Sequence, residues 1–181
     1  MARKILIAIL MACLAFGVSA ETAADNARLT KIFSEDQAAR ITRPIDWAKV
    51  GAQDKAHRKE VLALLSAGEI LTSNDFYHAA MVLQHADTTE DYQLAFSLSR
   101  VSATLDPSNE KARWLSAASW DRILMSKGVP QWYGTQYHNP VPGGPSELYK
   151  IDESVVTDAE RAAMKVPSLQ EAKDLLLQIN N

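Results

Sequence analysis

Three residues of the sequence have side chains suited to proton transfer or charge stabilisation and lie on otherwise apolar helix faces. His85 lies in the stretch that follows Thr72, and Asp121 and Arg122 flank an apolar stripe further along the chain. A histidine oriented by a carboxylate can act as a general base, and an arginine can stabilise developing negative charge. These residues are the catalytic candidates of a hydrolase-type enzyme with acid–base chemistry at His85 and Asp121.

The same polar groups also allow a purely structural interpretation. Asp121 would accept N–H bonds from the turn at Tyr133 to Thr135, Arg122 would bond to loop carbonyls, and Gln136 would close the network. A buried polar group left without a partner costs about 1–3 kcal/mol, so such pairing has a clear physical basis. The sequence holds no serine or cysteine nucleophile motif. Whether the protein is an enzyme is therefore left open.

The loop after the predicted fifth helix favours a binding function. Gly128 and Pro130 end the helix, and the chain then carries aromatic, amide and hydroxyl side chains in one short run. Ligand sites combine an apolar wall with a few convergent polar groups. The candidate ligand-binding residues are Gln131, Trp132, Tyr133, Thr135 and Gln136.

These loop residues suggest three kinds of partner. Trp132 and Tyr133 could stack on a small ligand such as a sugar or on a peptide, with the glutamines forming hydrogen bonds to it. Alternatively, Trp114 and Trp120 could join the loop in facing a protein. We expect an exported binding or interaction module of unknown ligand, with the enzyme as the alternative.

Cofactors and metals find no support in the sequence. His78 and His85 stand seven residues apart, whereas two histidines that chelate one metal on a helix are four apart. No glycine-rich loop for a phosphate group is present. With 19 basic and 22 acidic side chains, the formal charge is −3, which does not favour nucleic acid as a partner. We expect no metal and no cofactor.

The N-terminus has the three parts of a secretory signal over residues 1–20. Arg3 and Lys4 are followed by an apolar run and by small residues at Ser19 and Ala20. The prediction is an exported protein, periplasmic or secreted, with no stable membrane association once the signal is cleaved. A lipoprotein attached through Cys13, the chain's one cysteine, is the minor alternative.

Hydrophobic periodicity predicts one all-α domain over residues 21–181, with about seven helices in helical-hairpin, repeat-like packing and a long packed loop after the fifth helix. Residues 42–52 are predicted to be a linker that Trp47 anchors onto the core. Asp36 and Arg40, four residues apart, should form an ion pair that faces either solvent or the interior. The expected helices are 27–41, 53–67, one capped by residues 72–74, 91–105, 107–127 with Asp106 as its cap, and two short ones capped by Thr157 and Ser168.

The polar motifs resemble a bacterial family catalogued as domain of unknown function 6624. The matching residues are Asp36, Gln37, Arg40, Gln84, His85, Asp121, Arg122, Gly128, Pro130, Gln131 and the run Tyr133 to Gln136, with Arg161 and Leu169 near the end. The resemblance covers most of residues 21–181, and the loop is its specific part. It implies the location of a site and no particular reaction.

Overall fold

The computed structural model describes residues 23–141 and 143–180, which form seven α-helices and one small sheet. The predicted all-α fold with about seven helices is therefore confirmed. The predicted signal segment 1–20 and Cys13 lie outside the described residues. The helices are α1 Ala27–Ile41, α2 Trp47–Ser66, α3 Ser73–Gln84, α4 Thr89–Leu105, α5 Glu110–Ser126, α6 Asp158–Ala163 and α7 Leu169–Ile179.

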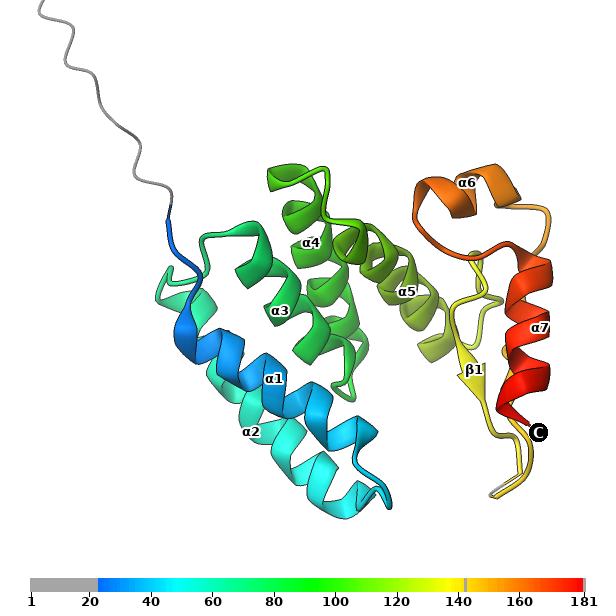
Figure 1. Ribbon diagram of the computed structural model, residues 1–181, viewed down its shortest axis with the longest axis horizontal. Coiled ribbons are helices and arrows are strands. Elements are labelled where there is room, and N and C mark those ends of the chain that lie inside the picture. The colour runs from blue at the N-terminus through cyan, green and yellow to red at the C-terminus, as the bar shows by residue number, and fades with distance from the viewer. Residues whose placement is uncertain (1–22, 142, 181) are drawn as a thin grey trace, which may run out of the picture.

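The helices follow one another across the molecule (Figure 1). Helices α1 and α2 lie at one end, α3 and α4 come next, and α5 separates them from β1, α6 and α7. Antiparallel strands β1 (Tyr137–His138) and β2 (Glu147–Leu148) form the sheet, and α7 packs beside β2. The chain after α5 thus builds a separate layer on the far side of α5.

The hydrophobic core joins α1 to α5. Its buried members include Leu29 of α1, Val61 of α2, Leu83 of α3 and Leu115 of α5. Small residues let the helices approach closely, because they hold little volume between two backbones. In α4 these small residues are Ala95, Ser99 and Ser102, all of them buried.

Helix α2 begins six residues earlier than predicted. The side chain of Asp46 accepts a hydrogen bond from the Lys49 N–H and starts the helix at Trp47. The predicted linker 42–52 is therefore wrong in its second half. Trp47 does not anchor the segment, because 66% of its surface is exposed.

Capping decides the other helix starts as well. Asn109, and not Asp106, caps α5, since its side chain accepts from the Ala112 N–H while Asp106 bonds to Ser108. The predicted capping boxes at Thr157 and Ser168 are both present.

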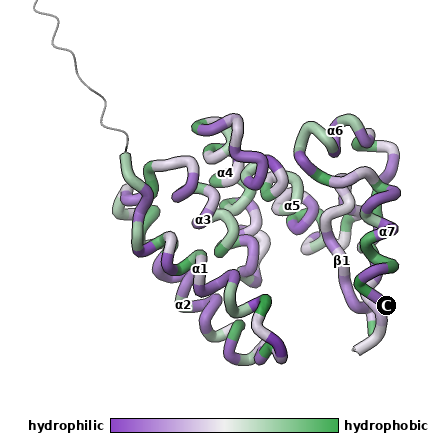
Figure 2. The backbone as a smooth tube through the Cα atoms, in the orientation of Figure 1, coloured by the Kyte–Doolittle hydropathy of each residue, from purple (hydrophilic) through white to green (hydrophobic). Residues whose placement is uncertain are grey.

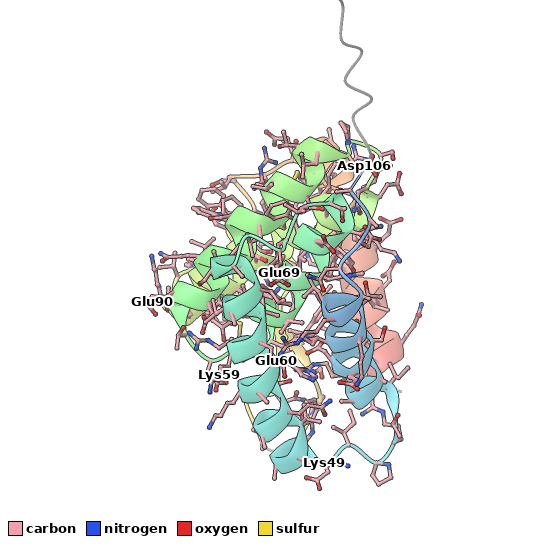
Figure 3. All side chains as sticks on the ribbon, turned by 90° about the vertical axis from the view of Figure 1, so that its left-hand side faces the viewer. Lys49, Lys59, Glu60, Glu69, Glu90 and Asp106 are labelled. Atoms are coloured by element: carbon pink, nitrogen blue, oxygen red, sulfur yellow. The ribbon has the colours of Figure 1, made fainter. Side chains whose placement is uncertain are left out.

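Polar and apolar residues alternate along the helices, as expected for elements with one buried side (Figure 2). Figure 3 shows Lys49, Lys59 and Glu60 along α2. The exposed surface of this helix therefore carries charges of both signs. Within residues 23–141 and 143–180, none of the helices has the length and apolar character needed to cross a membrane.

Candidate functional site

The carboxylate of Asp121 binds the backbone amides of the loop that follows α5. Its carboxylate, fully buried in α5, accepts hydrogen bonds from the N–H groups of Trp132 at 2.8 Å, Tyr133 at 3.0 Å and Thr135 at 3.1 Å. The Thr135 hydroxyl donates a fourth bond at 2.8 Å. Gly134, with φ of +82°, turns the chain so that its neighbours converge on one carboxylate. The loop is therefore fixed to α5 at several points.

The guanidinium of Arg161, in α6, binds backbone carbonyl groups of the same loop. Its Nε donates to the Tyr133 carbonyl at 3.1 Å and its Nη2 to the Trp132 carbonyl at 3.0 Å. Asp158 orients the nearly buried guanidinium at 3.0 Å. Sequence reasoning gave this role to Arg122, which is wrong, because Arg122 Nε instead donates to Gln136 Oε1 at 2.6 Å.

Gln131 closes the loop from inside. This fully buried side chain donates to the carbonyls of Gln136 at 3.0 Å and Tyr149 at 2.8 Å, and it accepts from the Gln136 N–H at 2.8 Å. Its backbone pairs with Lys150 and Asp152 of the returning chain. Gln131 and Gln136, both predicted to bind a ligand, therefore form hydrogen bonds inside the loop.

Burial and hydrogen bonding oppose each other at Asp121. Burial raises the pKa of its carboxyl above the ordinary value, and the bonds from Tyr133, Trp132 and Thr135 act in the opposite direction. The hydrogen bonds offset only part of the effect of burial. They occupy both carboxylate oxygens, so neither is free for a substrate.

The outer side of the loop forms one wall of a cleft of about 350 Å³, here called the aromatic cleft. Trp132 lies 5.0 Å from Trp120 of α5, and Trp120 lies 5.5 Å from Phe96 of α4, measured between ring centroids. The lining residues are Phe96, Arg100, Ser116, Trp120, Trp132, Tyr133 and Met164. Five of the seven are aromatic or methionine side chains, so the walls are mostly apolar.

The predicted ligand-binding residues thus divide into two groups. Trp132 and Tyr133 line the aromatic cleft, whereas Gln131, Thr135 and Gln136 bond within the loop or to α5. Sequence reasoning missed Phe96, Arg100 and Met164. Phe96 and Arg100 stand four residues apart and so share one face of α4, and this spacing was the available signal.

Two polar groups of the aromatic cleft lack partners. Arg100 forms no ion pair with any described residue, and the buried indole N–H of Trp120 has no acceptor there. Burial raises the pKa of the Tyr133 phenol, Asp121 and Glu160 raise it further, and Arg100 lowers it. Arg100 and the Tyr133 hydroxyl are therefore close enough to influence each other.

His85 belongs to a second polar cluster, between α1, α2 and the end of α3. Its Nδ1 lies 2.9 Å from Asp36 Oδ2, and Asp36 is fully buried. Arg40 bonds to Asp36 at 2.9 Å and to Asp54 at 2.8 Å. The predicted Asp36–Arg40 pair is confirmed and faces inward. The proposed pairing of His85 with Asp121 is wrong, because the partners of both residues lie elsewhere.

A single backbone carbonyl links the two regions. The carbonyl of Ala118, inside α5, accepts a hydrogen bond from Gln84 Nε2 at 3.3 Å and from Gln136 Nε2 at 3.1 Å. Gln84 precedes His85, and Gln136 ends the loop. The region of His85 and the loop are therefore both hydrogen-bonded to the same peptide group of α5.

Comparison with known proteins adds no relative. No protein-family model, curated protein or solved structure matches the chain. The resemblance to domain of unknown function 6624 stays a prediction. Among the described residues, no three His, Cys, Asp or Glu side chains are grouped so that they could hold a metal ion.

Proposed function

We propose that the protein is an exported binding module whose ligand occupies the aromatic cleft. The observation that carries the proposal is the placement of Trp132 and Tyr133 on the wall of this cleft by a loop that is fixed on both sides. The volume of about 350 Å³ lies at the lower end of the range for small-ligand sites.

The bonding of the loop supports this function because it prepares the site before a ligand arrives. Asp121 binds the amides of Trp132 and Tyr133, and Arg161 binds their carbonyls. A wall that is already ordered loses little conformational entropy on binding. The aromatic rings can therefore contribute most of their contact energy to affinity.

The test is a ligand screen on the mature protein with two tryptophan variants. Sugars, short peptides and small aromatic compounds are screened by NMR chemical-shift change. A ligand of the aromatic cleft should bind to wild type and to Trp114→Leu, whose ring is exposed outside the cleft, and lose affinity about tenfold or more in Trp132→Leu. Absence of binding from every class, or equal affinity of both variants, would refute the proposal.

A second candidate function is acid–base catalysis at His85. The favouring observation is the 2.9 Å contact between Asp36 and Nδ1, since a carboxylate on Nδ1 fixes the tautomer and leaves Nε2 as the base. Asp36 thus takes the orienting role first given to Asp121. The His85 side chain is 20% exposed, so the ring is not sealed in the interior.

This second candidate is tested with an activated ester such as p-nitrophenyl acetate. Wild type should hydrolyse it faster than His85→Gln by about a hundredfold, because general-base catalysis contributes about 10²–10⁴ in rate. Asp36→Asn should show an intermediate rate. Equal rates for wild type and His85→Gln would remove the enzyme hypothesis while leaving the binding module untouched.

A further inference from the structure

We infer that the ligand of the aromatic cleft carries a carboxylate on a flat apolar body. This inference rests on the proposed binding function and deepens it by naming the chemical class of the ligand. It follows from the shape of the walls, the kind of polar groups on them and the charges nearby.

The walls fit a flat apolar group. Trp120 and Trp132 are tilted by 56° with their centroids 5.0 Å apart, and Phe96 is tilted by 50° against Trp120. Rings inclined to one another in this way offer both faces and edges to a further ring. Met164 adds a flexible side chain that adapts to the outline of a guest.

The polar groups of the lining include one fixed positive charge, at Arg100, and the Tyr133 hydroxyl, which can donate or accept. Arg100 carries the one charged side chain of the lining and is without an ion-pair partner among the described residues. The Trp120 indole can only donate and lacks an acceptor. The Ser116 hydroxyl is already engaged with Ser99 and the Ala112 carbonyl. The Trp120 N–H is itself buried, so Arg100 is the accessible donor, and an anionic acceptor group on the ligand would complement its charge.

The neighbouring acidic residues do not favour a cation instead. Glu160 accepts bonds from the backbone and hydroxyl of Thr157, both at 2.8 Å, and does not line the cleft. Asp121 is covered by the loop amides. A cation stacked on the tryptophans would instead meet the positive charge of Arg100.

Three indole compounds of nearly equal size test the charge. Indole-3-acetate is the anion, indole-3-acetamide is its neutral isostere, and tryptamine is the cation. Isothermal titration calorimetry of the mature protein should show binding of the acetate at least about tenfold tighter than binding of the amide, since an ionic hydrogen bond is lost. Tryptamine should bind more weakly than both.

Two arginine variants locate the effect. Arg100→Gln should reduce the affinity for indole-3-acetate about tenfold and leave that for indole-3-acetamide nearly unchanged. Arg43→Gln serves as control, because Arg43 is an exposed arginine of the turn between α1 and α2, outside the aromatic cleft. Circular dichroism confirms that both variants are folded before titration.

The outcomes separate this inference from the function on which it rests. Equal binding of acetate, amide and tryptamine that is lost in Trp132→Leu would refute the carboxylate and keep the binding module. Acetate binding unaffected by Arg100→Gln would also refute it. No binding of any of the three compounds would overturn the inference, and the wider screen would then decide the function.

The carboxylate could belong to a free small acid or to the end of a peptide. The peptide Gly-Gly-Trp is therefore titrated with a free and with an amidated C-terminus. Tighter binding of the free peptide than of indole-3-acetate would assign a peptide end, and the reverse order would assign a small acid. Binding of the amidated peptide equal to that of the free peptide would contradict the proposed carboxylate.

Discussion

The side-chain amide of Gln131 bonds to both backbone groups of Gln136, as the backbone of a neighbouring strand would. The Gln131 amide accepts from the Gln136 N–H at 2.8 Å and donates to the Gln136 carbonyl at 3.0 Å. Neighbouring residues of paired β-strands exchange N–H and C=O bonds in this way through their backbones. The loop from Gln131 to Gln136 is too short to form two paired strands, and the Gln131 side chain closes it instead.

Changing Gln131 to Glu should unfold this loop. The substitution keeps the size of the side chain but replaces its donor NH₂, which faces the carbonyls of Gln136 and Tyr149, by a buried carboxylate oxygen. We expect a loss of about 3 kcal/mol or more in the free energy of unfolding, measured by urea denaturation. Gln178→Glu on the exposed side of α7 makes the same chemical change and should cost less than about 0.5 kcal/mol. A small loss in Gln131→Glu would contradict the geometry.

Changing Asp121 to Asn should loosen the loop from α5. An amide keeps one acceptor oxygen but presents an NH₂ group to the N–H donors of Trp132, Tyr133 or Thr135. The expected loss is about 1–3 kcal/mol by thermal melting. Asp87→Asn, at an exposed position, is the control and should leave the melting temperature nearly unchanged. If Asp121→Asn were stabilising, the residue would be held at a cost for function.

His78 should make stability fall in acid. Burial lowers the pKa of this histidine, with Asp25 and Asp75 acting in the opposite direction and Lys111 acting with burial. The unfolded chain takes up a proton near pH 6.5 and the folded protein only below that. The stability from neutral His78 is complete above ~pH 6.5 and is lost as the pH falls through the lower folded value.

The measurement is the melting temperature of wild type and His78→Gln at ~pH 7.5 and ~pH 5. Glutamine keeps a polar side chain without titrating in this range. The variant should lose the stacking of His78 on Phe33, whose ring centroids are 4.1 Å apart, at both pH values, but show the smaller fall between them. An identical fall in both proteins would show that His78 takes up its proton equally in the folded and unfolded chains.

Arg100→Gln should raise the pKa of the Tyr133 phenol further. Burial already raises it, Asp121 and Glu160 act in the same direction, and the positive charge of Arg100 opposes them. NMR titration of ring-labelled tyrosine would follow this resonance, assigned with Tyr133→Phe. Arg43→Gln should leave it in place. An unchanged Tyr133 titration in Arg100→Gln would place the guanidinium away from the aromatic cleft.

Local signals in the sequence predicted the helices well. Helix α1 has the predicted bounds because Asn26 caps it and Leu29 and Ile32 define its buried side. Helix α2 was predicted too short because the linker after Pro44 was extended to residue 52, whereas capping by Asp46 starts the helix at Trp47. A capping side chain two residues after the proline was the local signal that marked the true start.

The partners of the site residues were not predictable in the same way. Asp36 and His85 are 49 residues apart in the chain, and so no local spacing connects them. Arg122 and Arg161 are equally plausible donors to loop carbonyls, and only the packing of α6 against the loop selects Arg161. The loop was recognisable because its unusual residues are contiguous, but the α4 side of the aromatic cleft required the folded chain.

The carbonyl of Ala118 makes the two polar regions mechanically dependent on each other. Its bonds to Gln84 and Gln136 attach the end of α3 and the loop to one peptide group of α5. Local opening of either region removes a bond from the same acceptor, which lies in the middle of the molecule. Amide hydrogens of the loop should therefore exchange with solvent through the same cooperative opening as those at the end of α3, as members of one unit of unfolding.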